Sequence, residues 1–301
     1  VIAFGLMVAH RRKKAIIGKQ GLAIFSAMSI LFLIGLGVCY LAESAGNPMI
    51  DKLGVSQEIG SMEGKEMRFG VAQSALFTVA TTAFTTGSVN NMHDTLTPLG
   101  GLVAMFNMML NVVFGGKGVG LMNMMMYVFL TIFTACLLIG RTPQFLGKKI
   151  EEKEMKLIAL CLLIHPAIIL LLSGLAVATA GGVAGITNPG AHGLSQVLYE
   201  FASAAANNGS GFEGLADNTS FWNITTGLAM FFGRYVSLIL QLAIASLLAA
   251  KLWHADSAGT LKTDNALFTG LLVGVVLMIG ALTFLPALSL GPITEHLQLN
   301  I

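Results

Sequence analysis

Charged side chains are scarce in this chain of 301 residues: only 11% are Asp, Glu, Lys or Arg, whereas 55% are hydrophobic. A typical soluble domain carries about 25% charged residues. The mean hydropathy is +0.78, and apolar runs long enough to cross a bilayer recur along the whole chain. The composition therefore excludes a water-soluble domain and predicts a multi-pass protein of the lipid bilayer. A net charge of +2 is too small to indicate a nucleic-acid partner.

The signatures of nucleotide chemistry are also missing. No G-x-x-x-x-G-K-[ST] loop occurs, and the Gly-Gly-Lys-Gly run at 115–118 has neither its spacing nor its hydroxyl. There is no Asp-Lys-Thr-Gly phosphorylation motif and no H-E-x-x-H. We therefore expect a non-catalytic chain without an organic cofactor, whose energy comes from another chain. A rival interpretation, an intramembrane enzyme built on His165 or the Met-rich run at 122–126, lacks a paired acid and base.

Only three cysteines are present, and each lies in or beside an apolar run: Cys39, Cys136 and Cys161. We expect free buried thiols and no disulfide. The chain begins at Val1, without Met or a charged segment before the first apolar run. This beginning predicts that residues 1–9 end a span whose first part belongs to a missing N-terminal half.

Residues 73–91 combine a short apolar run with a turn rich in hydroxyl groups. The apolar part, 75–83, is far shorter than the roughly 20 residues that a span requires. Residues 85–88 (Thr-Thr-Gly-Ser) follow as irregular backbone, in which Gly87 is free to adopt a positive φ. A half-helix before such a turn is typical of a re-entrant pore loop, whose carbonyl oxygens replace the hydration shell of a cation. A polar outer loop is the alternative.

The same order of features returns about 120 residues later. A Gly-rich stretch precedes a short helix expected at 194–206, and irregular backbone follows at 207–211 (Asn-Asn-Gly-Ser-Gly). Because sites in transport proteins often form between internal repeats, this repetition favours two pore loops over one chance polar loop. We expect an all-α integral membrane fold of repeated helix–pore-loop–helix units. Its predicted parts are 1–19 (end of a preceding span and a cytoplasmic basic loop), 20–140 (one unit), 141–156 (a cytoplasmic loop), 157–250 (the other unit) and 251–301 (the final transmembrane helix and a tail).

Basic residues predict the topology. Residues 10–19 and 141–156 are rich in Lys and Arg, which places both loops in the cytoplasm. An even number of crossings must separate them, so residues 99–139 count as one crossing beside the span at 21–41. As one helix they would reach about 60 Å, twice the hydrocarbon thickness. We therefore expect one broken helix, interrupted at the glycine cluster 115–120. In the alternative, two ordinary helices place the 141–156 loop outside.

Several motifs, taken in order, resemble the potassium-binding subunit of the Kdp potassium-uptake ATPase. They are Thr85-Thr86-Gly87-Ser88-Val89-Asn90, Met92-His93-Asp94, Gly140-Arg141-Thr142-Pro143, Asn188-Pro189-Gly190, Asn207-Asn208-Gly209-Ser210 and Gly280-Ala281-Leu282-Thr283-Phe284. That subunit belongs to a superfamily of potassium-channel-like transporters with four pore-loop repeats around one filter. The resemblance covers about the C-terminal half of the family's usual length. It implies that 20–140 is the third repeat and 157–250 the fourth, and that the first two repeats are missing.

The resemblance also implies a potassium site and a function. Gly87 and Gly209 would be the central filter glycines. Neighbouring carbonyls or hydroxyls would come from Thr85, Thr86, Ser88, Asn207, Asn208 and Ser210. The chain would select extracytoplasmic K⁺ and pass it, beside the broken crossing, to a P-type ATPase catalytic subunit. The complex, with small accessory membrane subunits, would lie in the bacterial plasma (inner) membrane. The alternative is a Trk/Ktr-like passive or ion-coupled potassium transporter.

Four further residues are candidates for a gate or a tunnel. Arg234 lies about ten residues into a span, where a charge costs about 2.5–3.5 kcal/mol on insertion scales. It could stop potassium from leaking through, or it could cap helix carbonyls. Lys117, beside Gly115 and Gly116 in the glycine cluster, has the same two interpretations.

Three more polar residues have simpler explanations. Glu43 and Asp94 flank the expected outer mouth, where we expect solvated surface charges rather than groups that attract cations. His165 precedes Pro166, which should kink its span, and is expected to be a core histidine with a hydrogen-bond partner.

Overall fold

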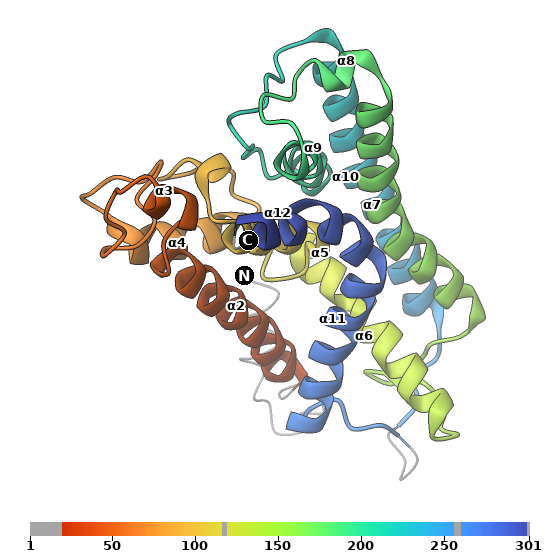
Figure 1. Ribbon diagram of the computed structural model, residues 1–301. Helices are drawn as coiled ribbons and strands as arrows, with labels where there is room; N and C mark the ends of the chain where they lie inside the picture. The colour runs from red at the N-terminus through yellow and green to blue at the C-terminus, as the bar shows by residue number, and fades with distance from the viewer. Residues whose placement is uncertain (1–19, 116–118, 256–259, 300–301) are drawn as a thin grey trace.

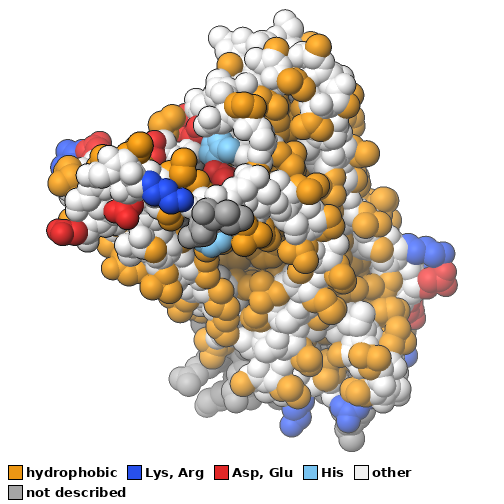
Figure 2. Space-filling view, viewed as in Figure 1, with side chains coloured by type: hydrophobic (Ala, Val, Ile, Leu, Met, Phe, Trp, Pro, Cys, Tyr) orange, Lys and Arg blue, Asp and Glu red, His pale blue; other side chains and the backbone are white. Residues whose placement is uncertain are grey.

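The computed structural model describes residues 20–115, 119–255 and 260–299, and most of these residues lie in helices. Within these ranges, five helices are long and apolar enough to cross a membrane. They are α2 (Gln20–Ser44), α6 (Val119–Leu138), α7 (Glu152–Ala178), α10 (Ser220–Ala250) and α11 (Ala266–Leu288). Figure 2 shows hydrophobic side chains over most of one face, with charged side chains gathered at its margins. The predicted all-α membrane fold is confirmed at this level.

Two shorter helices are held among the long ones. α4 (Gly70–Ala83) packs against α2 and against α5 (Pro98–Leu110). α9 (Ala191–Ala206) packs against both α7 and α10, to one side of that pair (Figure 1). Both helices begin earlier than predicted, but they end where the sequence places the two irregular turns. Two short elements lie before these helices, α3 (Pro48–Lys52) and α8 (Ala180–Val183).

The helix predicted over residues 99–139 is interrupted, as expected, although the break begins before the glycine cluster. α5 ends because Asn111 takes the left-handed conformation at φ +48, and Phe114 and Gly115 also have positive φ. Among residues with a side chain, Asn adopts this conformation most readily, so the helix stops before the glycines. α5 and α6 do not pack along each other, and Figure 1 shows α6 leading away from the end of α5.

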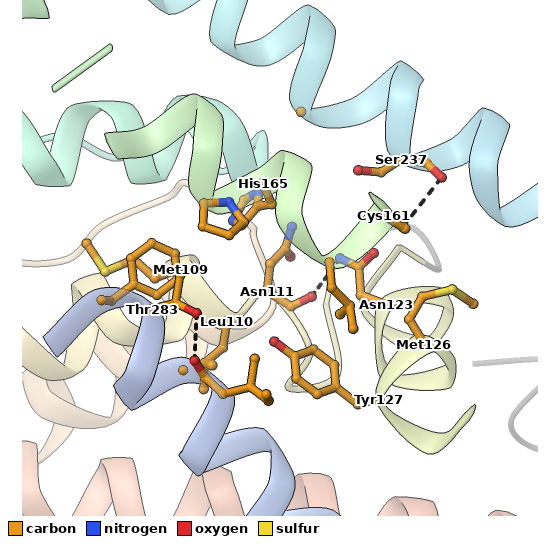
Figure 3. Close-up of a pocket in the computed structure, with 16 residues that line it drawn as sticks. Met109, Leu110, Asn111, Asn123, Met126, Tyr127, Cys161, His165, Ser237 and Thr283 are labelled. Atoms are coloured by element: carbon orange, nitrogen blue, oxygen red, sulfur yellow. Dashed lines mark hydrogen bonds between the residues drawn. The ribbon is translucent and has the colours of Figure 1, made fainter. Parts of the chain in front are cut away.

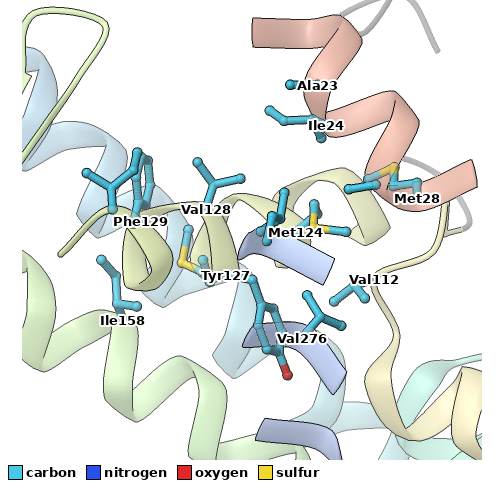
Figure 4. Close-up of a cluster of buried hydrophobic side chains, with 14 of the residues drawn as sticks. Ala23, Ile24, Met28, Val112, Met124, Tyr127, Val128, Phe129, Ile158 and Val276 are labelled. Atoms are coloured by element: carbon cyan, nitrogen blue, oxygen red, sulfur yellow. The ribbon is translucent and has the colours of Figure 1, made fainter. Parts of the chain in front are cut away.

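Apolar side chains around the break form the larger of two main cores. Figure 4 shows Ile24 and Met28 of α2 near Met124 of α6, with Val276 of α11 beside Tyr127. The Met-rich run thus contributes packing between helices that meet at irregular angles, as its flexible side chains suit. A second core surrounds α9 and includes Tyr199, Phe201 and Trp222. The three cysteines are free and buried, as predicted.

Two segments contain more structure than the sequence indicated. The loop predicted at 141–156 holds a small antiparallel hairpin, β1 (Gln144–Phe145) and β2 (Lys148–Lys149). Lys251, after α10, donates hydrogen bonds to Glu151 at 2.9 Å and to Glu154 at 2.6 Å, which ties the two segments together. The expected tail is also ordered, as η3 (Ser289–Ile293) and α12 (Thr294–Leu299). Non-helical backbone at Gly291 lets the chain turn there.

Candidate functional site

The turns that follow α4 and α9 share one backbone pattern. We call residues 85–88 the first turn and residues 207–210 the second turn. The first residue of each turn is a non-glycine residue in the left-handed backbone conformation: Thr85 at φ +50 and Asn207 at φ +55. Each then reaches a glycine with positive φ two positions later, Gly87 at +84 and Gly209 at +104. A β-branched residue such as Thr rarely adopts positive φ, so the first turn is strained.

The two turns also close their helices with the same hydrogen bond. The amide of Thr86 donates to the carbonyl of Thr81 at 3.0 Å, and that of Asn208 donates to the carbonyl of Ser203 at 2.9 Å. Each bond spans five residues across a left-handed residue, as in the Schellman ending of a helix. The two segments therefore have equivalent local structures, which the repeated order of residue types predicted.

These equivalent turns are in contact with each other. The side-chain Nδ2 of Asn208 donates to the Thr81 carbonyl at 2.7 Å. A Cβ atom at Gly87 would collide with the carbonyl oxygen of Asn208, whereas one at Gly209 would meet nothing within 4 Å. The fold thus brings together the two segments in which the sequence analysis places its filter residues.

The side chains of Asn208 and Ser210 in the second turn are directed into the protein and not toward solvent. Asn208 and Ser210 are buried, whereas Gly209 is exposed, and so are Thr86 and Ser88 of the first turn. Oδ1 of Asn208 accepts hydrogen bonds from the amide of Ser210 at 2.9 Å and from its hydroxyl at 2.7 Å. Because these side-chain oxygens are engaged within the protein, the second turn offers an ion mainly its main-chain carbonyls.

Two buried residues behind the second turn were not predicted to belong to the site. The hydroxyl of Tyr199 lies 2.8 Å from Oγ of Ser210 and 2.6 Å from Nδ1 of His93. Tyr199 lies on α9, and His93 opens η1 (His93–Thr95) after the first turn. The sequence placed a tyrosine inside an expected short helix, but nothing indicated which group its hydroxyl would meet.

A polar cavity lies where α5 breaks (Figure 3). Its volume is about 30 Å³. The residues that line it include Asn111, Asn123, His165 and Ser237. The side chain of Asn123 donates to the Asn111 carbonyl at 2.8 Å, which links the end of α5 to α6. The volume suits a small number of water molecules.

His165 lies beside the same cavity as a satisfied core histidine. Its Nε2 is 3.0 Å from the carbonyl oxygen of Met108. This bond confirms the structural interpretation of His165. It also satisfies a carbonyl near the end of α5, just before the break.

The structure describes two of the four candidate gate or tunnel residues, Arg234 and Gly115. Arg234 is half-buried on α10, and no hydrogen bond or ion pair joins it to another residue of the described ranges. Its neighbour Gly233 packs against the carbonyl of Ala205, next to the second turn. Gly115 lies in the break with φ +53. The two remaining candidates, at 116 and 117, lie outside the described residues.

Glu43 is not a solvated charge, so that expectation is wrong. Its side chain is fully buried and forms an ion pair with Lys65 at 2.7 Å. Oε1 also accepts hydrogen bonds from the amide of Thr97 at 2.8 Å and from its hydroxyl at 2.6 Å. The carboxylate thus closes the N-terminus of α5, where negative charge is favourable. Its partners come from loops that sequence patterns do not place.

Asp94 is also engaged rather than solvated. It accepts hydrogen bonds from His192 at 3.0 Å and from Gln196 at 3.1 Å. The other ring nitrogen of His192 lies 2.8 Å from Glu295 in α12. Burial lowers the pKa of His192, but hydrogen bonds with the two carboxylates and their charges outweigh burial and raise that pKa to about 9. The protonated ring therefore joins η1, α9 and α12.

The five apolar helices define a class, the multi-pass all-α membrane proteins. Within it, this chain belongs to the family of the potassium-transporting ATPase A subunit, whose model matches residues 1–297. The resemblance carried by the motifs is thereby confirmed.

Two curated relatives, both called potassium-transporting ATPase potassium-binding subunit, are similar over most of this chain. The protein from Clostridium acetobutylicum is 59% identical over 265 residues, which cover 88% of this chain and 48% of the relative. The protein from Geobacillus kaustophilus is 57% identical over 282 residues, covering 94% and 50%. The chain spans about half the length of the curated relatives it matches.

Proposed function

We propose that this chain is the C-terminal half of the channel-like, non-catalytic subunit of an ATP-driven potassium-uptake complex in the bacterial plasma membrane. In this proposal the first and second turns supply two of the four segments of a potassium filter. One observation carries it: two equivalent irregular turns, at the ends of two short buried helices, lie against each other among helices that can span a membrane.

Physical chemistry supports a cation at these turns. Irregular backbone is tolerated at membrane depth only where protein buries it or where it lines a wet cavity. The C-terminal ends of α4 and α9, which carry partial negative charge, meet at the turns and favour a cation there. Two turns supply only half of a four-fold ring of carbonyls, so the other half must come from residues outside this chain.

The route after the filter forms the second part of the proposal. The break between α5 and α6, with its polar cavity, would help direct K⁺ sideways into an ATPase catalytic subunit, and small accessory membrane subunits would complete the complex. The names of the relatives support an ATPase partner. Family membership favours this function over a Trk/Ktr-like transporter.

The test replaces each turn glycine in the full-length subunit, assembled with its ATPase. Gly87→Asp and Gly209→Asp should each abolish uptake at micromolar K⁺, because a charged side chain would distort the carbonyl ring. Gly54→Asp is the matched control: Gly54 has φ +82 and open space around it, but lies outside both turns. It should keep wild-type uptake. Wild-type affinity in both turn variants would overturn the filter assignment.

A further inference from the structure

We propose that a buried chain of hydrogen bonds from His93 through Tyr199 and Ser210 to Asn208 fixes the second turn and thereby sets its discrimination between potassium and rubidium. Tyr199 and His93 act here as positioning residues: Tyr199 touches the turn, and His93 acts on the turn through Tyr199. The inference rests on the proposed filter and goes beyond it by identifying what holds one quarter of that filter in shape.

The chain of contacts is continuous and hidden from solvent. Nδ1 of His93 lies 2.6 Å from the Tyr199 hydroxyl, which lies 2.8 Å from Oγ of Ser210. That hydroxyl lies 2.7 Å from Oδ1 of Asn208, whose Nδ2 donates to the Thr81 carbonyl at 2.7 Å. The side chains of His93 and Tyr199 are fully buried, and Asn208 and Ser210 are no more than 7% exposed. Hydrogen bonds in such a dry environment are strong and depend on one another.

The direction of every proton in this chain follows from Asn208. Its Nδ2 faces a main-chain carbonyl and its Oδ1 faces the main-chain amide of Ser210, so the amide group has one orientation. The Ser210 hydroxyl must then donate to Oδ1 and accept from Tyr199. Tyr199, whose single proton is thereby used, must accept from Nδ1–H of His93. His93 therefore carries a proton on Nδ1.

The environment of His93 favours the neutral ring over the charged one. Burial, followed by the positive charge of Lys65, lowers the pKa of His93 to about 4. Its Nε2 is buried and has no hydrogen-bond partner among the described residues. The ring therefore serves as a fixed donor to Tyr199 at physiological pH.

The second turn depends on this chain because its glycine makes few contacts of its own. A Cβ atom at Gly87 of the first turn would collide with Asn208, but Gly209 has open space around the same position. The amide of Gly209 donates one hydrogen bond, to Oγ of Ser203 at 3.1 Å. Gly209 is otherwise held through its two neighbours, Asn208 and Ser210, which the hydrogen-bond chain joins. Ions of similar size are discriminated by the placement and field of the carbonyl groups, so a loosened turn should discriminate less.

The decisive variant is Tyr199→Phe. The ring of Tyr199 stacks on Phe212 with centroids 4.3 Å apart, and phenylalanine keeps that packing while it removes only the hydroxyl. In the assembled complex the KM for K⁺ should rise about tenfold, which corresponds to about 1.4 kcal/mol. The preference for K⁺ over Rb⁺ should fall, and the maximal uptake rate should stay within about twofold of wild type.

Two companion variants separate this role from simple packing. Ser195→Ala removes a buried hydroxyl from the same helix, but that hydroxyl donates only to the Ala191 carbonyl of its own helix, so KM and Rb⁺ preference should not change. Ser210→Ala interrupts the chain at its next link and should reproduce the effect of Tyr199→Phe. The double variant should be no worse than either single one, because both remove the same chain.

The outcomes separate this inference from the filter assignment. Wild-type KM and Rb⁺ preference in both Tyr199→Phe and Ser210→Ala would overturn the inference. So would a loss of maximal rate or of assembly without a change in KM or selectivity in Ser210→Ala. If Gly209→Asp abolishes uptake in the same assay, only the role of the hydrogen-bond chain has failed; if Gly209→Asp transports normally, the filter assignment itself has failed.

Discussion

Alanine at Gly87 should impair potassium uptake more than alanine at Gly209, although both glycines have left-handed backbone. Their φ values are +84 and +104, in a region that costs an L-residue about 1–2 kcal/mol. At Gly209 the new methyl group would enter open space, so this strain is the whole cost. If it acts entirely on the ion-bound state, the affinity for K⁺ should fall about 5–30-fold.

At Gly87 a second cost is added. The new Cβ would overlap the main-chain carbonyl oxygen of Asn208, so the two turns must separate. Such overpacking typically costs about 1–3 kcal/mol, which brings the sum to about 2–5 kcal/mol. The affinity should then fall at least about 30-fold, and by more than a thousandfold at the upper limit.

The assay is the KM for K⁺ uptake by the assembled complex from micromolar to millimolar K⁺. Gly54→Ala, at φ +82 with open space around it, carries the same backbone strain outside both turns and should leave KM unchanged. If Gly209→Ala proves equal to or worse than Gly87→Ala, the two turns are not packed as described, and the reasoning fails.

Three further predictions concern charged groups. Arg234→Ala should raise ATP-independent potassium leak without altering ion selection, because a fixed positive charge beside a narrow path repels a cation; a variant that neither assembles nor leaks would instead favour a structural role. Lys65→Met should destabilise the protein by about 3–5 kcal/mol, since it leaves a buried carboxylate unpaired. Adding Glu43→Gln should restore much of the thermal midpoint, and a further fall would contradict this explanation. The pKa of His192 is raised from 6.5 to about 9, so its contribution to stability is complete below pH 6.5 and disappears as the pH rises through about 9. The difference in thermal midpoint between wild type and His192→Gln should therefore shrink between pH 6 and pH 10, and a difference that grew would be the opposite of the expected linkage.

The helical framework could be predicted because it depends on local composition. Spans follow from the length of apolar runs, and the two turns follow from glycine beside hydroxyl or amide side chains. The break was predicted from the glycine cluster, but it begins at Asn111, because one left-handed residue is enough to end a helix.

The hydrogen-bond and ion-pair partners of the buried polar residues could not be predicted, because packing between distant segments brings each partner into place. Glu43 meets a lysine from a loop after α3, and Asp94 meets a histidine of α9. Likewise, Tyr199 carries no motif, and its role appears only once His93 lies beside it. Sequence patterns indicate which residues are unusual in an apolar chain, but not which of them will pair.

The contact between Gly87 and Asn208 constrains the order in which the protein can be completed. Chains are synthesised from the N-terminus at about 5–20 residues per second, so the second turn follows the first by roughly 6–24 s. During that interval no second turn packs against the first turn, and an isolated loop does not sustain the cost of holding Thr85 at φ +50. The first turn therefore takes its final shape only when α9 arrives, which makes this part of the protein a late product of folding.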